Sequence, residues 1–218
     1  MSGTPDPPDE PATRFAPARD DFSRMMLGYR FGMEQVALRL EILREEFAEL
    51  QADSPIEHIS TRMKTPESIL EKATRQGTEL ETDDIRESIT DIAGIRVICS
   101  FVADVYRLVE SLTTQPDLTV QVVKDYIQQP KATGYRALHV IVEVPVYLSS
   151  GPMQVPVEVQ FRTVAMDFWA STEHKILYKY EGDVPDDLRR RMTDAAATAA
   201  RMDEEMAALH AAVHGIRE

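Results

Sequence analysis

Hydrophobic positions recur at helical spacing near both ends of the chain. Between residues 22 and 50 they fall alternately four and three residues apart, which predicts one apolar stripe on a long helix. Its members are Phe22, Met26, Tyr29, Met33, Val36, Leu40, Leu43, Phe47 and Leu50. A second stripe consists of Leu188, Met192, Ala195, Ala199, Met202, Met206, Leu209 and Val213. Each stripe is compatible with packing on the chain's own core and with a helix-to-helix contact between subunits.

Strands and helices alternate in the middle of the chain. The segments that resemble strands are 58–64, 93–101, 118–126, 137–146 and 154–162. The segments that resemble helices are 65–77, 82–89, 103–113 and 163–179. Helix 65–77 has the clearest boundaries, with Thr65 as its cap, Pro66 at its first position and Gly77 as its stop. This order predicts an α+β fold, a mixed β-sheet with helices packed on it.

Composition divides the chain into four parts. Residues 1–21 are rich in Pro and Asp and poor in apolar side chains, which predicts a disordered tail. A long helix is expected over 22–53, the mixed domain over 54–181 and a second long helix over 182–218. A length of 218 residues with 43% apolar side chains suits one globular domain with helical additions.

Charge and cysteine content limit the classes of function. The net charge of -13 disfavours general affinity for nucleic acid or anionic membranes, so any phosphate binding must be local. The sequence has no apolar run near the roughly 20 residues of a membrane span and no signal-peptide pattern, so we expect a cytoplasmic protein. The single cysteine, Cys99, excludes an internal disulfide and a cysteine-based zinc site, and we expect it to be buried.

Two segments supply carboxylates that could act together. In "VPVEVQFRT" (155–163) alternate side chains face opposite ways, which leaves Glu158, Gln160 and Arg162 on the face away from the core. This row is compatible with a half-solvated sheet or with the floor of a polar cleft. In "TDIAGIRV" (90–97) Asp91 precedes an apolar strand, where a lone Asp usually serves as a turn or cap residue. If the two strands are neighbours, both carboxylates could bind magnesium, which prefers oxygen ligands.

Positively charged side chains are concentrated in "STRMKTPESILEKATR" (60–75), where a predicted strand is followed by a capped helix. This arrangement suits a polyphosphate, because the helix N-terminus adds amide donors, although Glu67 and Glu71 also allow ordinary solvated surface charge. The polar residues that share faces here are Arg62 and Lys64 on the strand and Ser68, Lys72 and Arg75 on the helix.

Aromatic rings and cations concentrate in "DYIQQPKATGYRALH" (125–139). Gly134 allows Tyr135 to swing out of the loop, and an exposed tyrosine ring can stack on a purine. Lys131, Arg136 and His139 lie close enough in sequence to reach phosphate or sugar groups. The segment therefore indicates a purine nucleotide, although alone it is weakly specific.

Taken in order, five segments resemble the synthetase domain of the RelA/SpoT family, and specifically its single-domain members, the small alarmone synthetases. The segments are "RMKTPESILEK", "DIAGIRV", "KDYIQQPKATGYRALH", "VPVEVQFRT" and "MDFWASTEHKILYKY", which together span about 62–180. The resemblance implies a nucleotidyltransferase-like mixed sheet. It also implies transfer of the β,γ-pyrophosphate of ATP to the ribose 3′-hydroxyl of GDP or GTP, with Mg²⁺ as cofactor and AMP and (p)ppGpp as products.

The resemblance also assigns roles by position. Asp91 matches the magnesium ligand, and Glu158 matches a second acidic position that shares the metal or takes the 3′-hydroxyl proton. The positions that match the ATP site are Arg62 and Arg96, which clasp adenine, and Lys64, Ser68, Lys72 and Arg75, which hold phosphates. The positions that match the guanine-nucleotide site are Lys131, Gly134, Tyr135, which stacks on guanine, Arg136, His139, Gln160 and Arg162.

The resemblance sets several further expectations. Two positions depart from the family pattern: Thr133 stands where Asn is usual, and Leu177 stands where Arg is often found. Because Asp91 and Glu158 are both present, we nevertheless expect an active enzyme. The alternative is a catalytically weak module of the same fold that binds guanine nucleotide or single-stranded RNA. About sixty residues precede the synthetase segment, which leaves no room for the family's hydrolase domain, so synthesis alone is expected. Some small relatives are tetramers, which favours a homotetramer here.

Overall fold

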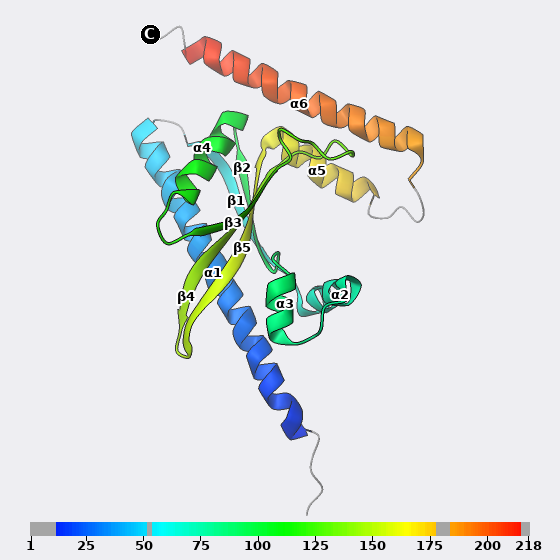
Figure 1. Cartoon of the computed structure of the whole chain (residues 1–218). Helices are drawn as coiled ribbons and strands as arrows, with labels where there is room; N and C mark the ends of the chain where they lie inside the picture. Colours follow the sequence, from blue (N-terminus) through cyan, green and yellow to red (C-terminus); the bar gives the residue numbers. More distant parts are fainter. Residues whose placement is uncertain (1–11, 52–53, 178–183, 215–218) are drawn as a thin grey trace, which may run out of the picture.

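A five-stranded mixed β-sheet with helices around it forms the body of the protein (Figure 1). The computed structural model describes residues 12–51, 54–177 and 184–214. The helices in this part of the chain are α1 (Ala12–Gln51), α2 (Pro66–Gln76), α3 (Thr82–Ser88), α4 (Val102–Thr113), α5 (Val164–Leu177) and α6 (Asp186–His214). The strands are β1 (Ile56–Met63), β2 (Ala93–Cys99), β3 (Thr119–Asp125), β4 (Leu138–Leu148) and β5 (Gly151–Thr163). The predicted α+β class is confirmed, and each predicted middle element is present with bounds shifted by a few residues, while residues 178–179 of the last predicted helix lie outside the described part.

The order of the strands is β1-β2-β5-β4-β3, which differs from their order in the chain. β2 and β5 run parallel in the centre, and the three other neighbouring pairs are antiparallel. Gly94 of β2 lies opposite Glu158 of β5 in this register. The strand that follows Asp91 and the strand that carries Glu158 are therefore direct neighbours, as the hypothesis of two cooperating carboxylates requires.

Helices α1 and α4 cover one face of the sheet and form the main core with it. Val157, Val159 and Phe161 are fully buried on this face, which confirms the alternation predicted for β5. Tyr29 and Leu40 of α1 are also buried against the sheet. The apolar stripe of α1 therefore packs on the chain's own core up to Phe47, and Leu50 at its end is exposed.

The start of α1 differs from the sequence-based expectation. The disordered tail was predicted to reach residue 21, but the helix begins at Ala12, and residues 1–11 lie outside the described part. Residues 12–21 fall within this helix, although their low apolar content favoured disorder. Once the stripe from Phe22 onward has formed the helix, each further residue adds one backbone hydrogen bond at little cost.

Helix α6 crosses the end of the sheet beside α5 (Figure 1). It buries only Ala196 in its first half, and its last turns leave large apolar side chains exposed. These residues are Met202, Met206, Leu209 and Val213, each more than half exposed to solvent. The stripe of α6 thus differs from that of α1, because only part of it is covered by this chain.

Local signals in the sequence account for several boundaries. The Thr65 hydroxyl oxygen accepts a hydrogen bond from the Ser68 backbone N–H at the start of α2, and Gly77 ends the helix in a left-handed conformation. Cys99 is fully buried, as predicted. Among the described residues, none of the helices has the length and apolar character that crossing a membrane requires.

Candidate active site

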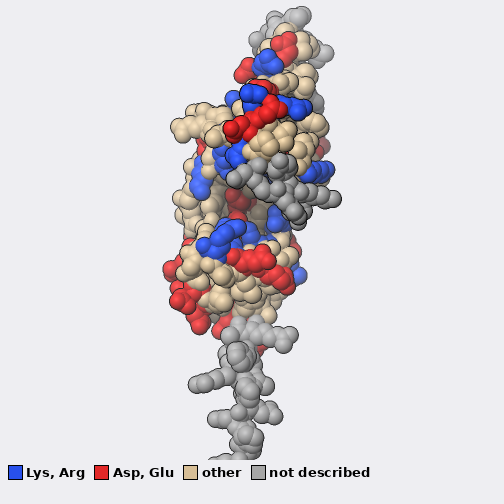
Figure 2. All heavy atoms as spheres, turned by 90° about the vertical axis from the view of Figure 1, so that its right-hand side faces the viewer, with Lys and Arg blue, Asp and Glu red and all other residues tan. Residues whose placement is uncertain are grey.

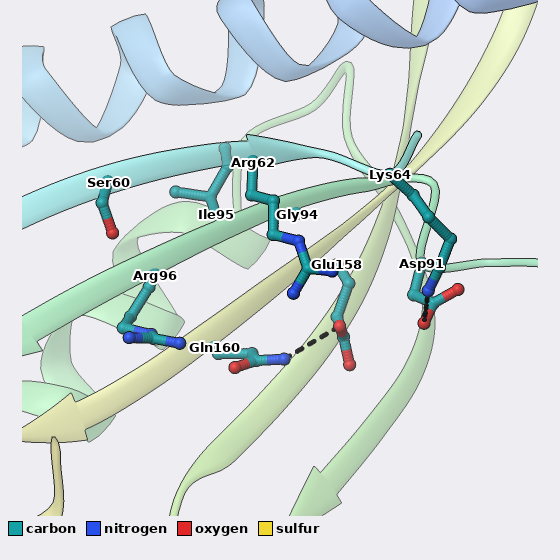
Figure 3. Close-up of a pocket in the computed structure, with 9 residues that line it drawn as sticks. All are labelled: Ser60, Arg62, Lys64, Asp91, Gly94, Ile95, Arg96, Glu158 and Gln160. Carbon is teal, nitrogen blue, oxygen red and sulfur yellow. Dashed lines mark hydrogen bonds and ion pairs between the residues drawn. The ribbon is translucent and has the colours of Figure 1, made fainter. Parts of the chain in front are cut away.

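The face of the sheet opposite α1 is open and polar. A cavity of about 320 Å³ lies on it between the strands and the loop that carries Asp91 (Figure 3). Its lining residues are Ser60, Arg62, Lys64, Asp91, Gly94, Ile95, Arg96, Glu158 and Gln160. Figure 2 shows this side of the molecule, where Lys and Arg atoms gather around a hollow with acidic atoms inside it. The positive charge is therefore local, within a chain whose net charge is -13.

Strand register brings the predicted residues together. Arg62 of β1 pairs with Gly94 of β2, and Gly94 pairs with Glu158 of β5. Arg96 pairs with Gln160 two residues further along the same strands. Side chains two residues apart in a strand share a face, so three neighbouring strands present one polar row to the cavity.

Asp91 is held by two lysines. Lys64 Nζ and Lys72 Nζ each donate a hydrogen bond to a different carboxylate oxygen of Asp91, both at 2.8 Å. Burial alone would raise the pKa of Asp91, but these two lysines outweigh burial and lower it below its ordinary value. Asp91 is therefore ionised at neutral pH, and two cations converge on it, Lys64 directly after β1 and Lys72 from α2.

Glu158 is the second carboxylate of the cavity. His139 Nδ1 lies 3.0 Å from Glu158 Oε1, and Gln160 Nε2 donates to Oε2 at 3.0 Å. Burial raises the pKa of Glu158, but the hydrogen bonds from His139 and Gln160 prevail, so its pKa is below the ordinary value. The negative charge of Asp91 acts in the opposite direction and raises this pKa slightly, because a nearby like charge disfavours ionisation.

A chain of hydrogen bonds connects Glu158 with the loop that carries Tyr135. Arg162 Nη2 donates to the Tyr135 hydroxyl at 2.9 Å, and that hydroxyl lies 2.7 Å from His139 Nε2. A guanidinium can only donate, and burial raises the pKa of Tyr135, so the tyrosine keeps its proton and donates it to Nε2. The other ring nitrogen, Nδ1, is the one that contacts Glu158. The position of Tyr135 is thereby linked to the orientation of this carboxylate.

The placement of Tyr135 differs from the expectation of an exposed ring. The side chain is half-buried, and two cations lie over its ring, Lys131 Nζ at 4.9 Å and Arg162 Cζ at 5.2 Å from the centroid. Tyr126 stands edge-on to Tyr135 with the centroids 6.1 Å apart, and Lys131 also lies over the Tyr126 ring. Contacts that the tertiary structure brings to the loop account for the burial, and spacing in the sequence could not reveal them.

Asp167 is a member of the site that the sequence analysis missed. Its Oδ1 accepts from Arg162 Nη1 at 2.9 Å and lies 3.3 Å from Arg96 Nη1. Arg162 is itself 6% exposed, so this pairing compensates a nearly buried charge. A carboxylate four residues after the end of β5 was the available signal, but it resembled an ordinary helix N-terminal acid.

Other predicted residues lie outside the cavity lining. Arg75 is exposed on α2, and Ser68 is half-buried at the α2 N-terminus, where its hydroxyl accepts from Thr65. Arg136 Nη1 donates to the Ile127 carbonyl at 3.5 Å, which directs it along the loop. The structure thus brings the two carboxylates close to Arg62, Arg96, Lys64 and Lys72. Ser68, Arg75 and Arg136 lie outside this cavity.

Comparison with known proteins supplies the decisive observation. The family described as "Region found in RelA / SpoT proteins" matches residues 61–183, more than half of the chain. The chain belongs to the RelA/SpoT family. Its similarity to RelA/SpoT proteins extends beyond that region, since the GTP pyrophosphokinase YwaC of Bacillus subtilis (strain 168) is 44% identical over 187 residues. That alignment covers 86% of this chain and 89% of YwaC.

Solved structures of RelA/SpoT relatives agree with the fold. Small alarmone synthetase 1 from Bacillus subtilis, bound to its product pppGpp, matches with a TM-score of 0.80 and 38% identity. The match covers 88% of this chain and 97% of that one. The same synthetase bound to AMPCPP matches with a TM-score of 0.74 and 35% identity, over 89% of this chain and 98% of that one.

Proposed function

We propose that this protein transfers the β,γ-pyrophosphate of ATP to the ribose 3′-hydroxyl of GDP or GTP, forming ppGpp or pppGpp and releasing AMP. The observation that carries the proposal is one cavity lined by Asp91, Glu158 and the cations of β1 and β2. The named activities of the relatives support it, because they are GTP pyrophosphokinases and alarmone synthetases. We assign catalysis to Asp91 and Glu158.

The chemistry requires a proton acceptor beside the acceptor hydroxyl. Glu158 is ionised at neutral pH and can take the 3′-hydroxyl proton as that oxygen bonds to the β-phosphorus of ATP. The bond from the β-phosphorus to the oxygen that stays with AMP breaks in the same step, and AMP leaves with that electron pair. His139 and Gln160 hold both oxygens of Glu158, so the carboxylate is oriented before substrate arrives.

The donor nucleotide brings polyphosphate charge to the cations. Lys64 and Lys72 converge on Asp91 in this structure, and their ammonium groups can also neutralise phosphate oxygens of ATP. Arg62 and Arg96 line the same cavity and present guanidinium planes suited to clasping adenine. Ser68 and Arg75 are assigned to the outer phosphates, because they follow on the same helix.

The two carboxylates of the cavity fit a magnesium ion. Mg²⁺ is usually bound by one or two carboxylates, with phosphate oxygens and water completing its shell. Among the residues that the structure describes, no cluster of three or more metal-ligating side chains offers an all-protein site. Asp91 and Glu158 would therefore hold the ion together with the nucleotides, and the bound ion would offset the charge of the transferred group.

The deciding experiment mixes the protein with ATP, Mg²⁺ and either GDP or GTP. The expected result is stoichiometric formation of AMP and a 3′-pyrophosphorylated guanine nucleotide, resolved by anion-exchange chromatography. Omission of the guanine nucleotide should abolish AMP release and serves as the control. Binding of guanine nucleotide without AMP would instead support a catalytically weak module, and the presence of both carboxylates argues against that outcome.

Tyr135 is assigned to the guanine base, with Lys131, Gly134, Arg136 and His139 around the acceptor. Removal of the ring in Tyr135→Ala should raise the KM for GDP by roughly tenfold to a hundredfold, because stacking on a base contributes about 1–3 kcal/mol. The KM for ATP should stay within about twofold. Steady-state kinetics with each substrate varied in turn measures both values.

Two further variants make the Tyr135 test specific. Tyr135→Phe keeps the ring but loses the hydrogen bonds to His139 and Arg162, so kcat should fall more than the affinity for GDP. Tyr147→Ala removes a ring that is 79% exposed on β4 and should change neither value. An unaltered KM for GDP in Tyr135→Ala would contradict stacking at this residue.

We also propose a homo-oligomer, with a tetramer favoured, in which the exposed apolar face of α6 contacts a second copy of the chain. Met202, Met206 and Leu209 are 58%, 51% and 51% exposed, an unusual state for a helical stripe. Light scattering at micromolar concentration should give a multiple of the 24.6 kDa chain mass, and Met206→Glu should lower it. A monomer in the unaltered protein would contradict this arrangement.

A further inference from the structure

The loop that carries Tyr135 rests directly on helix α6. Gly134 has a φ of +90°, and a Cβ atom placed there would lie only 2.5 Å from the Cβ of Ala196. The backbone of the loop therefore contacts α6 with no space for a side chain at Gly134. Backbone hydrogen bonds close the same loop, from Gly134 N to Lys131 O at 2.8 Å and from Lys131 N to Tyr135 O at 3.2 Å.

A small apolar cluster separate from the main core joins the loop to α5 and α6. Trp169 and Ala170 of α5 are buried together with Ala196, and Tyr135 and Met192 pack against them. The indole N–H of Trp169 donates to the Met192 carbonyl at 3.0 Å, which fastens α5 to α6. Tyr135 is therefore buried by α6 and α5 on one side and linked to His139 on the other.

A polar contact fastens α6 to the end of β5. The Thr163 hydroxyl donates to Asp203 Oδ2 at 2.8 Å, and its oxygen accepts from the Met166 backbone N–H at 3.1 Å. Burial raises the pKa of Asp203, while Thr163 and the charge of Arg136 act in the opposite direction. Asp203 thus lies within the electrostatic reach of the loop, two turns along α6 from Ala196.

We propose that α6 positions the acceptor-nucleotide site. It does so through Ala196, which packs against Gly134 and Tyr135 and holds their loop in place. The inference rests on the proposed function, since that function makes Tyr135 the ring that binds guanine. None of the residues that line the described cavity comes from α6, and the contact of α6 with the loop of Tyr135 is made where Ala196 meets Gly134. A loop held in place beforehand loses less conformational freedom when ligand binds, which strengthens binding.

The test enlarges the side chain on which the loop rests. Ala196→Val adds methyl groups where the loop backbone already contacts the helix, so it should displace Gly134 and Tyr135. Ala195→Val is the matched control, because Ala195 is the exposed neighbour on the same helix and the change has the same helix propensity. Ala196→Val should raise the KM for GDP on the order of tenfold to a hundredfold relative to Ala195→Val.

The outcomes distinguish positioning from general damage. If α6 positions the loop, Ala196→Val and Ala195→Val should have the same KM for ATP and the same thermal midpoint of unfolding. Isothermal titration calorimetry without ATP should then show that Ala196→Val binds GDP more weakly than Ala195→Val does. Equal GDP affinity in the two variants would overturn the inference. If Ala196→Val does not fold, Ala196→Gly against Ala195→Gly repeats the comparison, because it removes the methyl group beneath Gly134.

The proposed function fails by a different result. If the unaltered protein forms no AMP from ATP and GDP, the function is wrong, whereas the calorimetric comparison of the two alanine positions still measures whether α6 controls guanine-nucleotide binding. If the unaltered protein forms AMP normally and both valine variants bind GDP equally, only the role of α6 is wrong.

Discussion

Glu158→Gln is expected to lower turnover by roughly 10²- to 10⁴-fold, because the amide cannot accept the proton of the 3′-hydroxyl. The fold should persist, since the amide oxygen of Gln can still accept the hydrogen bond from His139 Nδ1. The KM values for ATP and GDP should change little, because the loss falls on a proton transfer that takes place in the transition state. Quenched-flow measurement of AMP formation with both nucleotides saturating gives the rate directly.

Glu143 provides the matched control for Glu158→Gln. It lies on the neighbouring strand β4, is half-buried and is outside the cavity lining. Glu143→Gln removes the same charge from a nearby strand and should keep turnover within about twofold. Turnover near the unaltered rate in Glu158→Gln would remove this carboxylate from the proposed mechanism, whatever Glu143→Gln does.

Asp91→Asn is expected to lower turnover by at least about 10²-fold and also to change how the protein responds to ATP. The substitution removes the carboxylate that Lys64 and Lys72 share at 2.8 Å, so the two ammonium groups face each other without a counter-charge. The nucleotide-free protein should melt at a lower temperature. AMPCPP without added metal should then raise the melting temperature more than it does in the unaltered protein, because its phosphates supply the missing negative charge.

Asp83→Asn is the control for this second prediction. The Asp83 side chain is 91% exposed on α3 and lies 3.6 Å from Arg86, so its loss should alter neither turnover nor the response to AMPCPP. Appreciable turnover in Asp91→Asn would contradict a catalytic role. A response to AMPCPP no larger than that of the unaltered protein would contradict the view that the two lysines belong to the phosphate site.

The sequence was most informative where the signal is local. Thr65 and Gly77 mark the ends of α2 through hydrogen bonds and backbone conformations that depend only on adjacent residues. The row of Glu158, Gln160 and Arg162 follows from strand periodicity, which places alternate side chains on opposite faces. The relation of this row to Asp91 was open, because a parallel pair of strands joins segments more than sixty residues apart in the chain.

Contacts across long separations account for what the sequence analysis missed or misplaced. Asp167 became a site residue only because α5 starts where β5 ends and aims its carboxylate at Arg162 and Arg96. Tyr135 appeared exposed because nothing near it in sequence covers it, whereas Ala196 of α6 lies some sixty residues away. Neither contact has a periodic or motif signature from which it could be inferred.

The amino-acid sequence by itself determined the α+β class, the order of the elements, the two candidate carboxylates and the family, because periodicity, capping and motifs are properties of adjacent residues. Only the tertiary structure decided that Asp91 and Glu158 share one cavity, that α1 covers the opposite face, and that α6 supports the loop of Tyr135. The physical reason is that strand pairing and helix docking depend on how much apolar surface the whole chain buries. No single segment of the sequence specifies that burial.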